Sequence, residues 1–192
     1  ITKKYTKDNF SLSAKLQKET AGSEYHPFSY KGVHQQNITV NFKKSSWGFT
    51  AGGTHNDFNG FGGDAYGRGK TWKPKEQWIG NAKISYNKGP VNVYYRIDGL
   101  NEDIKSRNPI NYNNYKAIDQ KYTTDRFTHQ LQGGYTFSKK LQMATIMAYT
   151  DYKRKTRSTR HDFEKDTDEL TTGEGEQDIS KFNSFVFRNT LY

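Results

Sequence analysis

The sequence predicts an all-β protein, an antiparallel transmembrane β-barrel segment of about eight strands that occupies residues 1–192. Two observations predict this fold class. Apolar and polar residues alternate with a period of two over stretches of about ten residues. These stretches are joined alternately by short turns and by long polar loops. Outer-membrane barrels have short periplasmic turns and long extracellular loops, whereas a soluble β-sandwich has no reason to sort its connections in this way.

The two kinds of connection differ in length and composition. The short ones are rich in Lys, Ser, Asn, Gly and Pro and cover residues 43–46, 87–90 and 138–140. The long ones are polar and are expected over residues 19–33, 56–75, 101–125 and 154–178. Because the two kinds alternate, the short turns are expected at one edge of the sheet and the long loops at the other.

The strands follow from the alternation in chain order. In the first six, every second residue is mostly apolar or small, and these faces cover residues 10–16, 38–42, 47–53, 78–86, 91–97 and 131–137. The last two strands, over residues 141–153 and 179–192, are less regular because Ile146, Asn183 and Asn189 interrupt their alternation. A full-length alternation indicates that one face is apolar and the other is polar.

The two faces have different expected surroundings. Charged residues in mid-strand, such as Lys15, Lys83, Arg96 and Asp98, fall on the polar face. In a barrel this face lines the lumen, and in a soluble sheet it lies in bulk water, so both interpretations stay open here. Aromatic residues gather where strands meet the short turns, which is the expected position of a periplasmic girdle. These membrane-interface aromatics are Phe42, Trp47, Tyr86, Tyr135 and Phe137.

Composition excludes several other classes. Only 32% of residues are hydrophobic, yet the chain has 14 Tyr, 12 Phe and 3 Trp, which is too aromatic for a disordered protein. A polar average with many aromatics fits a barrel, in which every second residue faces lipid. No run of about 18 apolar residues exists, so a transmembrane helix is excluded. The absence of cysteine excludes disulfide scaffolds, thiolate metal sites and cysteine nucleophiles.

The net charge of +10 raises the question of a nucleic-acid partner. A basic run over residues 153–160 is followed by an acidic stretch over residues 162–178. No predicted helix could enter a groove and no aromatic platform lies beside the basic residues, so no nucleic acid is expected. The opposite charges belong to one hairpin and are expected to pair. Contact with the phosphates of lipopolysaccharide is the second interpretation of the basic run.

Two loop regions carry candidate binding residues. Aromatics with nearby amides suit a flat organic ligand, and the candidates are Tyr25, His26, Phe28, Tyr30, Tyr112 and Tyr115. Asp57, Asn59 and Asp64 form the beginning of a calcium-loop pattern, although the terminal Glu of that pattern is missing. An ordinary Gly-rich turn is the alternative to a Ca²⁺ site at these residues. Haem ligation by His26 or His55 is a further alternative.

The chain resembles the TonB-dependent outer-membrane receptors, the cobalamin and siderophore receptors in particular. Residues 1–4 (Ile-Thr-Lys-Lys), followed by the first strand at residues 10–14, resemble the junction at which the plug of these receptors enters the barrel. Residues 1–7 would form this junction. The hairpin segments at residues 47–51 and 133–138 are also similar to those of the family. The resemblance implies that the chain is the N-terminal part of a barrel of about 22 strands.

The resemblance also implies a function and a location. Such a receptor lies in the outer membrane of a Gram-negative bacterium, in contact with lipid and lipopolysaccharide. It binds a scarce small-molecule nutrient, such as cobalamin or a ferric siderophore, and imports it when TonB pulls on a plug region not in this chain. Some loop aspartates of cobalamin receptors hold calcium, and a surface lipoprotein that covers the loops is a further implied partner.

The chain is not expected to be an enzyme. It contains no Ser-His-Asp set that can be placed, no Gly-Lys-Ser/Thr phosphate loop and no His-Glu-x-x-His motif. Three alternatives to a receptor segment stay open. They are a self-contained small eight-stranded barrel acting as an adhesin or structural protein, an outer-membrane enzyme, and a soluble carbohydrate-binding β-domain.

Overall fold

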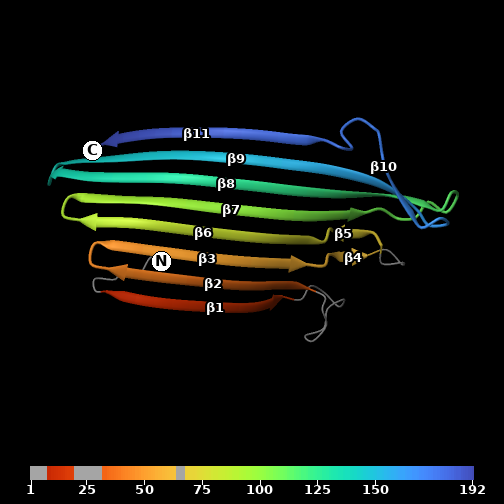
Figure 1. Cartoon of the computed structure of the whole chain (residues 1–192), viewed down its shortest axis with the longest axis horizontal. Coiled ribbons are helices and arrows are strands. Elements are labelled where there is room, and N and C mark those ends of the chain that lie inside the picture. The colour runs from red at the N-terminus through yellow and green to blue at the C-terminus, as the bar shows by residue number, and fades with distance from the viewer. Residues whose placement is uncertain (1–7, 20–31, 64–67) are drawn as a thin grey trace.

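The computed structural model describes residues 8–19, 32–63 and 68–192, which form antiparallel β-structure throughout (Figure 1). Eight strands are long, and they are β1 (Asn9–Glu19), β2 (Val33–Lys44), β3 (Trp47–Phe58), β6 (Lys75–Lys88), β7 (Val91–Arg107), β8 (Lys116–Ser138), β9 (Leu141–Asp162) and β11 (Ile179–Leu191). Three are short, and they are β4 (Phe61–Gly63), β5 (Lys70–Trp72) and β10 (Thr167–Leu170). The predicted all-β antiparallel class is therefore confirmed.

The long strands form one sheet in which each strand pairs with its neighbours in the chain. The order is β1-β2-β3-β6-β7-β8-β9, and the outer edge of β9 pairs with both β10 and β11. Strands β4 and β5 form a separate two-stranded ribbon. Within the described residues β1 and β11 lie at opposite edges and do not pair with each other, so the sheet is open.

The three tight hairpins lie together at one end of the sheet, as predicted (Figure 1). Ser45 and Gly89 hold the first position of their two-residue turns with φ of 54° and 55°. The β8–β9 hairpin contains a register shift between Thr136 and Ser138. Without this bulge the register at the turn would place Leu131 opposite Ala148. The bulge places Leu131 opposite Met147 instead, so the apolar residues of β8 and β9 lie on one face.

The predicted loops over residues 101–125 and 154–178 are largely wrong. Strand β7 continues to Arg107, β8 begins at Lys116 and β9 continues to Asp162, so the three strands extend beyond the rest of the sheet (Figure 1). These extensions are polar on both faces, which removes the alternation by which a strand is recognised. Cross-strand polar contacts stabilise them instead. Asp103 of β7, for example, binds the Lys121 ammonium at 2.9 Å.

The apolar side chains do not form an internal core. Ala117 is the single buried hydrophobic residue in the described part of the chain. Large apolar side chains lie exposed instead, with Leu16 at 83% and Phe185 at 68% of their full accessible area. A sheet of this kind cannot bury its apolar surface by itself, so that surface must be covered by something else.

Candidate membrane-facing surface

One face of the sheet is apolar from edge to edge. The strand registers align one row of apolar residues across all eight long strands without a polar interruption. From β1 to β11 this row is Phe10, Phe42, Phe49, Ile84, Tyr95, Leu131, Met147 and Phe187. Side chains directly opposite on neighbouring strands are the contacts that stabilise a sheet. The apolar residues that recur at every second position of each strand therefore form one continuous surface, called the apolar face below.

The apolar face has a constant height along the strands. On β3 and β6 it runs from the pair Trp47–Tyr86 to the pair His55–Trp78, and the next pair outward is polar, Asp57–Glu76. On β7 and β8 it ends where Asn101 meets Asp125. From Trp47 to His55 the strand rises about 27 Å. A strand of about 9–11 residues is the length that crosses a bilayer when tilted by about 45°.

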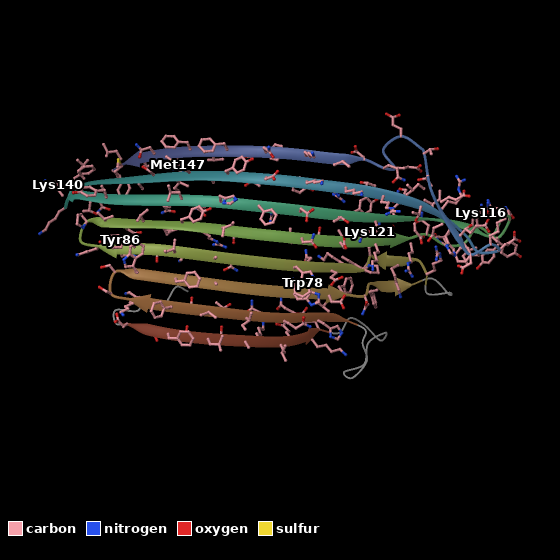
Figure 2. All side chains as sticks on the ribbon, viewed as in Figure 1. Trp78, Tyr86, Lys116, Lys121, Lys140 and Met147 are labelled. Atoms are coloured by element: carbon pink, nitrogen blue, oxygen red, sulfur yellow. The ribbon has the colours of Figure 1, made fainter. Side chains whose placement is uncertain are left out.

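The predicted interface aromatics lie together at the hairpin end of the apolar face. The rings of Trp47 and Tyr86 are 4.9 Å apart, and those of Tyr135 and Phe137 are 4.7 Å apart in an edge-to-face arrangement. Phe42 is 45% exposed. Figure 2 shows Tyr86 at this end. Their common position agrees with a girdle, and contact with a membrane interface stays a prediction.

A second aromatic pair, His55 and Trp78, which sequence reasoning missed, marks the opposite limit of the apolar face. His55 stacks on Trp78 with ring centroids 4.0 Å apart. His55 Nε2 and the Trp78 indole N–H both contact a carboxylate oxygen of Glu76, at 3.2 and 3.3 Å. Inside this limit, on β7 and β8, the Tyr95 hydroxyl lies 2.6 Å from His129 Nδ1. Rings with one polar edge are typical of a boundary between an apolar phase and water.

The opposite face is a hydrogen-bonded polar surface. An amide ladder crosses four strands, in which Gln35 donates to Asn56 at 2.9 Å, Asn56 to Gln77 at 3.4 Å, and Gln77 to Glu102 at 2.5 Å. Arg96 donates to Asp98 at 2.6 Å, so two of the charges predicted for this face pair with each other. Satisfied polar contacts suit a face that borders water or another polar surface.

The extensions of β7, β8 and β9 form a separately packed polar end, called the polar tip below. Arg68 binds both carboxylate oxygens of Asp119 at 2.8 Å and lies over the Phe163 ring at 4.6 Å. Lys116 pairs with Asp162 at 3.1 Å, and its hydrogen bond holds the pKa of Asp162 below the ordinary value. Two such charge-assisted contacts fix the tip without an apolar core.

The predicted ligand-binding aromatics are only partly described. Tyr112 and Tyr115 lie in the turn at the end of the β7–β8 hairpin and are 55% and 50% exposed. The nearby amide oxygens of Asn111 and Asn114 accept backbone N–H groups, at 3.0 and 3.1 Å, and so shape the turn. The other candidates, Tyr25, His26, Phe28 and Tyr30, lie outside the described residues. Ligand binding by this group stays a prediction.

The predicted calcium site is also only partly described. Asp57 lies on β3 opposite Glu76, and Asn59 follows the end of that strand. Asp64 lies outside the described residues. In the part of the chain that the structure describes, no group of three or more His, Asp or Glu side chains is arranged to hold a metal. A Ca²⁺ ion at Asp57, Asn59 and Asp64 remains a prediction.

The basic run differs from its prediction in two respects. His161 pairs with Asp168 at 2.9 Å, but Lys153, Lys155 and Arg157 form no ion pair with any described residue. The expected pairing within the hairpin is therefore wrong for these three residues. Lys153 and Lys155 lie opposite Lys181 and Ile179 of β11 and not opposite acidic residues. An aromatic partner also exists, since Arg154 lies over the Tyr122 ring at 4.9 Å.

Comparison with family models, with curated proteins and with solved structures finds no match to this chain. In the described ranges no helix is long and apolar enough to cross a membrane.

Proposed function

We propose that the chain forms part of the wall of an outer-membrane β-barrel, with the apolar face toward lipid and the polar face toward the lumen. The observation that carries this proposal is the apolar row that crosses all eight long strands. Its limits support the same interpretation, because aromatics border the face at both ends and the spacing suits a bilayer. Because outer-membrane barrels have short turns on the periplasmic side, this proposal makes the end with the three tight hairpins periplasmic and the polar tip extracellular.

We further propose that this barrel is a TonB-dependent receptor that imports a scarce nutrient such as cobalamin or a ferric siderophore. The support is the resemblance of residues 1–4 and of the first strand to the plug-to-barrel junction of that family. The open edges of β1 and β11 agree with a wider barrel, because exposed edge strands of this length need partners. In this proposal the chain transports and does not catalyse.

The membrane location is tested by fractionating cells and following the native protein with an antibody. The proposal expects it in the outer-membrane fraction, with electrophoretic migration that changes on boiling. Recovery in the soluble fraction would overturn the barrel proposal and favour the soluble β-domain. The transport role is tested by deleting the gene and measuring uptake of labelled cobalamin and of labelled ferric siderophores. Normal uptake of every tested nutrient would argue against the receptor.

A self-contained eight-stranded barrel, acting as an adhesin or structural protein, is the second candidate. It is favoured by the number of long strands, because eight strands can close a small barrel filled with side chains. The chain has no native cysteine, so pairs of cysteines introduced into β1 and β11 give a clean test. Rapid disulfide formation between facing pairs would show closure of β1 onto β11. Its absence over a full register scan would favour the wider barrel.

A further inference from the structure

The apolar face divides between β7 and β8 into two halves of opposite shape. On β3, β6 and β7 one row holds three glycines directly opposite one another, Gly53, Gly80 and Gly99. They leave a cavity of about 740 Å³, which Trp78 borders on β6 (Figure 2). A Cβ atom added at Gly80 would meet no other atom within 4 Å, so this part of the surface is open. The outer surface of β3, β6 and β7 is called the hollow half below.

The outer surface of β8, β9 and β11, called the bulky half below, carries large side chains in the same region. Phe127 stands directly opposite Gly99 in the glycine row, and Tyr149 and Phe185 lie one pair nearer the hairpin end. These three side chains are 50%, 42% and 68% exposed. A hollow beside a ridge is self-complementary, because a two-fold axis between them places the ridge of one copy against the hollow of another.

The two halves also differ in charge just beyond the apolar limit. Two rows of residues border the apolar face there. In these rows the hollow half contributes three carboxylates, those of Asp57, Glu76 and Asp103. The bulky half contributes three ammonium groups, those of Lys153, Lys155 and Lys181. A two-fold axis between β7 and β8 therefore brings unlike charges together as well as unlike shapes.

The bulky half stays positive when its own carboxylates are included. Asp125 accepts a hydrogen bond from Asn101 at 2.7 Å, and Asp151 lies one row closer to the hairpin end. These two carboxylates are outnumbered by the three lysines, none of which forms an ion pair with a described residue. The lysines are thus available to carboxylates of a second molecule.

The area of this surface is sufficient for a specific contact. Four strands, β6 to β9, are together about 19 Å wide, and the apolar face is about 27 Å high. Two such surfaces bury about 1,000 Å², the lower limit for a specific protein interface. Lipid already covers apolar surface in a bilayer, so a second protein competes with it only by packing closely, and small residues permit that close approach.

We propose that two copies of the chain associate side by side in the membrane, related by a two-fold axis that runs along the membrane normal between β7 and β8. The hollow half of each copy then faces the bulky half of the other. Phe127 and Tyr149 of each copy face the glycines of the other, and the lysines of each approach the carboxylates of the other. Both polar tips point to the same side, and β1 and β11 stay outside the contact. This inference rests on the proposed outer-membrane location.

The axis is tested by crosslinking single cysteines of the intact protein in native outer membranes, since the chain has no cysteine of its own. Ile97 of β7 lies opposite His129 of β8 and so adjoins the axis. In Ile97→Cys the two thiols should be joined by a reagent that spans about 10 Å, the separation of sheets packed face to face. The readout is a covalent dimer of twice the mass on denaturing electrophoresis.

The matched control is Leu12→Cys. Leu12 lies on β1 in the same row as Ile97, four strands away from β7. Ile97→Cys should give at least about tenfold more dimer, because a residue at the axis meets its own copy in every pair whereas Leu12 meets it only by collision. Equal yields from the two cysteines, or no dimer from Ile97→Cys, would overturn the proposal.

The charge contact is tested by exchange in the Ile97→Cys background. Glu76→Lys should lower the dimer yield by at least about fivefold, because the change acts twice across a two-fold interface. Adding Lys155→Glu should restore the yield to within about twofold, which a variant that merely misfolds would not do. Lys44→Glu, a charge reversal on the same face at the hairpin end, is the control. Loss without rescue, or an equal loss in Lys44→Glu, would overturn the pairing of the two halves.

The shape contact is tested by filling the hollow. Gly80→Leu should lower the dimer yield by at least about tenfold, because overpacking acts at both copies of the site. Gly80→Ala adds one methyl group that meets no atom of its own chain, so its loss should be smaller. An unchanged yield in Gly80→Leu would show that lipid fills the hollow and would overturn the proposal. Boiling-dependent migration checks that each variant assembles, and the charge exchange decides where Gly80→Leu does not.

Failure of this inference is distinguishable from failure of the proposed function. Recovery of the wild-type protein outside the outer membrane would overturn the proposed function itself. Protein that lies in the outer membrane and gives equal, low yields from Ile97→Cys and Leu12→Cys would overturn only the paired arrangement.

Discussion

The membrane-length part of the sheet and the polar tip are built from the same strands, yet they are stabilised in opposite ways. Along the apolar face the large side chains are exposed, and no described apolar side chain there is buried. In the tip lie Ala117, the single buried apolar residue of the described chain, and Ser158, which is fully buried. β8 and β9 run through both parts.

The difference shows that surroundings, more than strand pairing, distinguish the two parts. The tip pairs several of its charges internally, for example Arg68 with Asp119, and its polar surface can exist in water. The apolar face leaves rows of aromatic and aliphatic side chains without contacts, which water would penalise by about 25 cal/mol per Å². A hydrocarbon solvent removes that penalty. A charge placed on the apolar face should therefore lower the stability of the fold more than a changed charge on the polar face or in the tip.

The largest effect is expected from a charge in the middle of the apolar face. Ala82 lies midway between its two limits, opposite Ala51 and Ile97. If the proposed barrel forms, Ala82→Arg should destabilise it by about 2–4 kcal/mol, the cost of an arginine at the bilayer midplane. The measurement is the midpoint of urea unfolding in lipid vesicles.

The matched control for this change is Asn81→Arg, one residue away on the polar face. Asn81 lies opposite Asp98, so an arginine there gains a neighbouring carboxylate. Its stability should stay within about 0.5 kcal/mol of wild type, as for other surface changes. Equal destabilisation by the two arginines would show that both faces meet the same surroundings, and the assignment of the apolar face to lipid would be wrong.

The next effect concerns the tip. Asp119→Ala removes the bidentate partner of Arg68, whose side chain is 16% exposed, and should destabilise the tip locally by about 1–3 kcal/mol. Hydrogen exchange of the amides at the ends of β7 and β8 should speed up, while assembly of the barrel stays unchanged. Glu164→Ala is the control, because that side chain is exposed in the β9–β10 turn and forms no ion pair with a described residue. Loss of barrel assembly in Asp119→Ala would contradict the independence of the two parts.

The sequence predicts the membrane-length part better than the tip, for a physical reason. One apolar and one polar environment impose a period of two, and this pattern gave the strands and the faces. The tip is polar on both faces, so its strands carry no such pattern and were predicted as loops. Cross-strand partners such as Lys121 and Asp103 are far apart in sequence, and alternation alone does not reveal them.

Three glycines that lie opposite one another on the apolar face, Gly53 on β3, Gly80 on β6 and Gly99 on β7, show the same limit. Gly80 and Gly99 lie on the two strands that a two-residue turn joins. Counting along both strands from the pair Lys88–Val91, which closes this turn, places the two glycines opposite each other. Their alignment was thus available from the sequence. Gly53 joins them through the long connection between β3 and β6, whose length does not fix a register. The position of Lys181 opposite Lys153 was hidden similarly, because β11 reaches β9 by another long connection.

A smaller effect is expected at the hairpin end, where backbone conformation decides. Gly89 has a φ of 55°, and a Cβ there would meet no atom within 4 Å. Gly89→Ala should cost about 1–2 kcal/mol, the price of a left-handed conformation for alanine. Gly133→Ala has equal space without the positive φ and should be neutral or slightly stabilising. Unfolding midpoints compare the two, and equal shifts would contradict the turn geometry.

The smallest effect is a pH dependence confined to the strands beyond the apolar face. Burial raises the pKa of Asp103, but hydrogen bonds from Thr123 and Lys121 outweigh burial and hold this pKa below its ordinary value. A lowered folded pKa means that Asp103 stabilises the fold above about pH 4 and that this contribution is lost as the pH falls through the folded value. Amide protection near Asp103 and Thr123 should therefore decrease between about pH 4 and pH 2.

Asp103→Asn separates this carboxylate from the other acidic groups of the tip. The variant keeps the size of the side chain and cannot titrate, so its amide protection around Thr123 should stay constant over the pH range in which the wild type loses protection. The carboxyl carbon resonance of Asp103 gives the pKa directly. A pKa at or above the ordinary value of 3.8 would mean that burial outweighs the two hydrogen bonds. The β7–β8 extension would then be stabilised mainly by strand pairing, and the contrast between a charge-paired tip and the exposed apolar face would rest on the pairs Arg68–Asp119 and Lys116–Asp162.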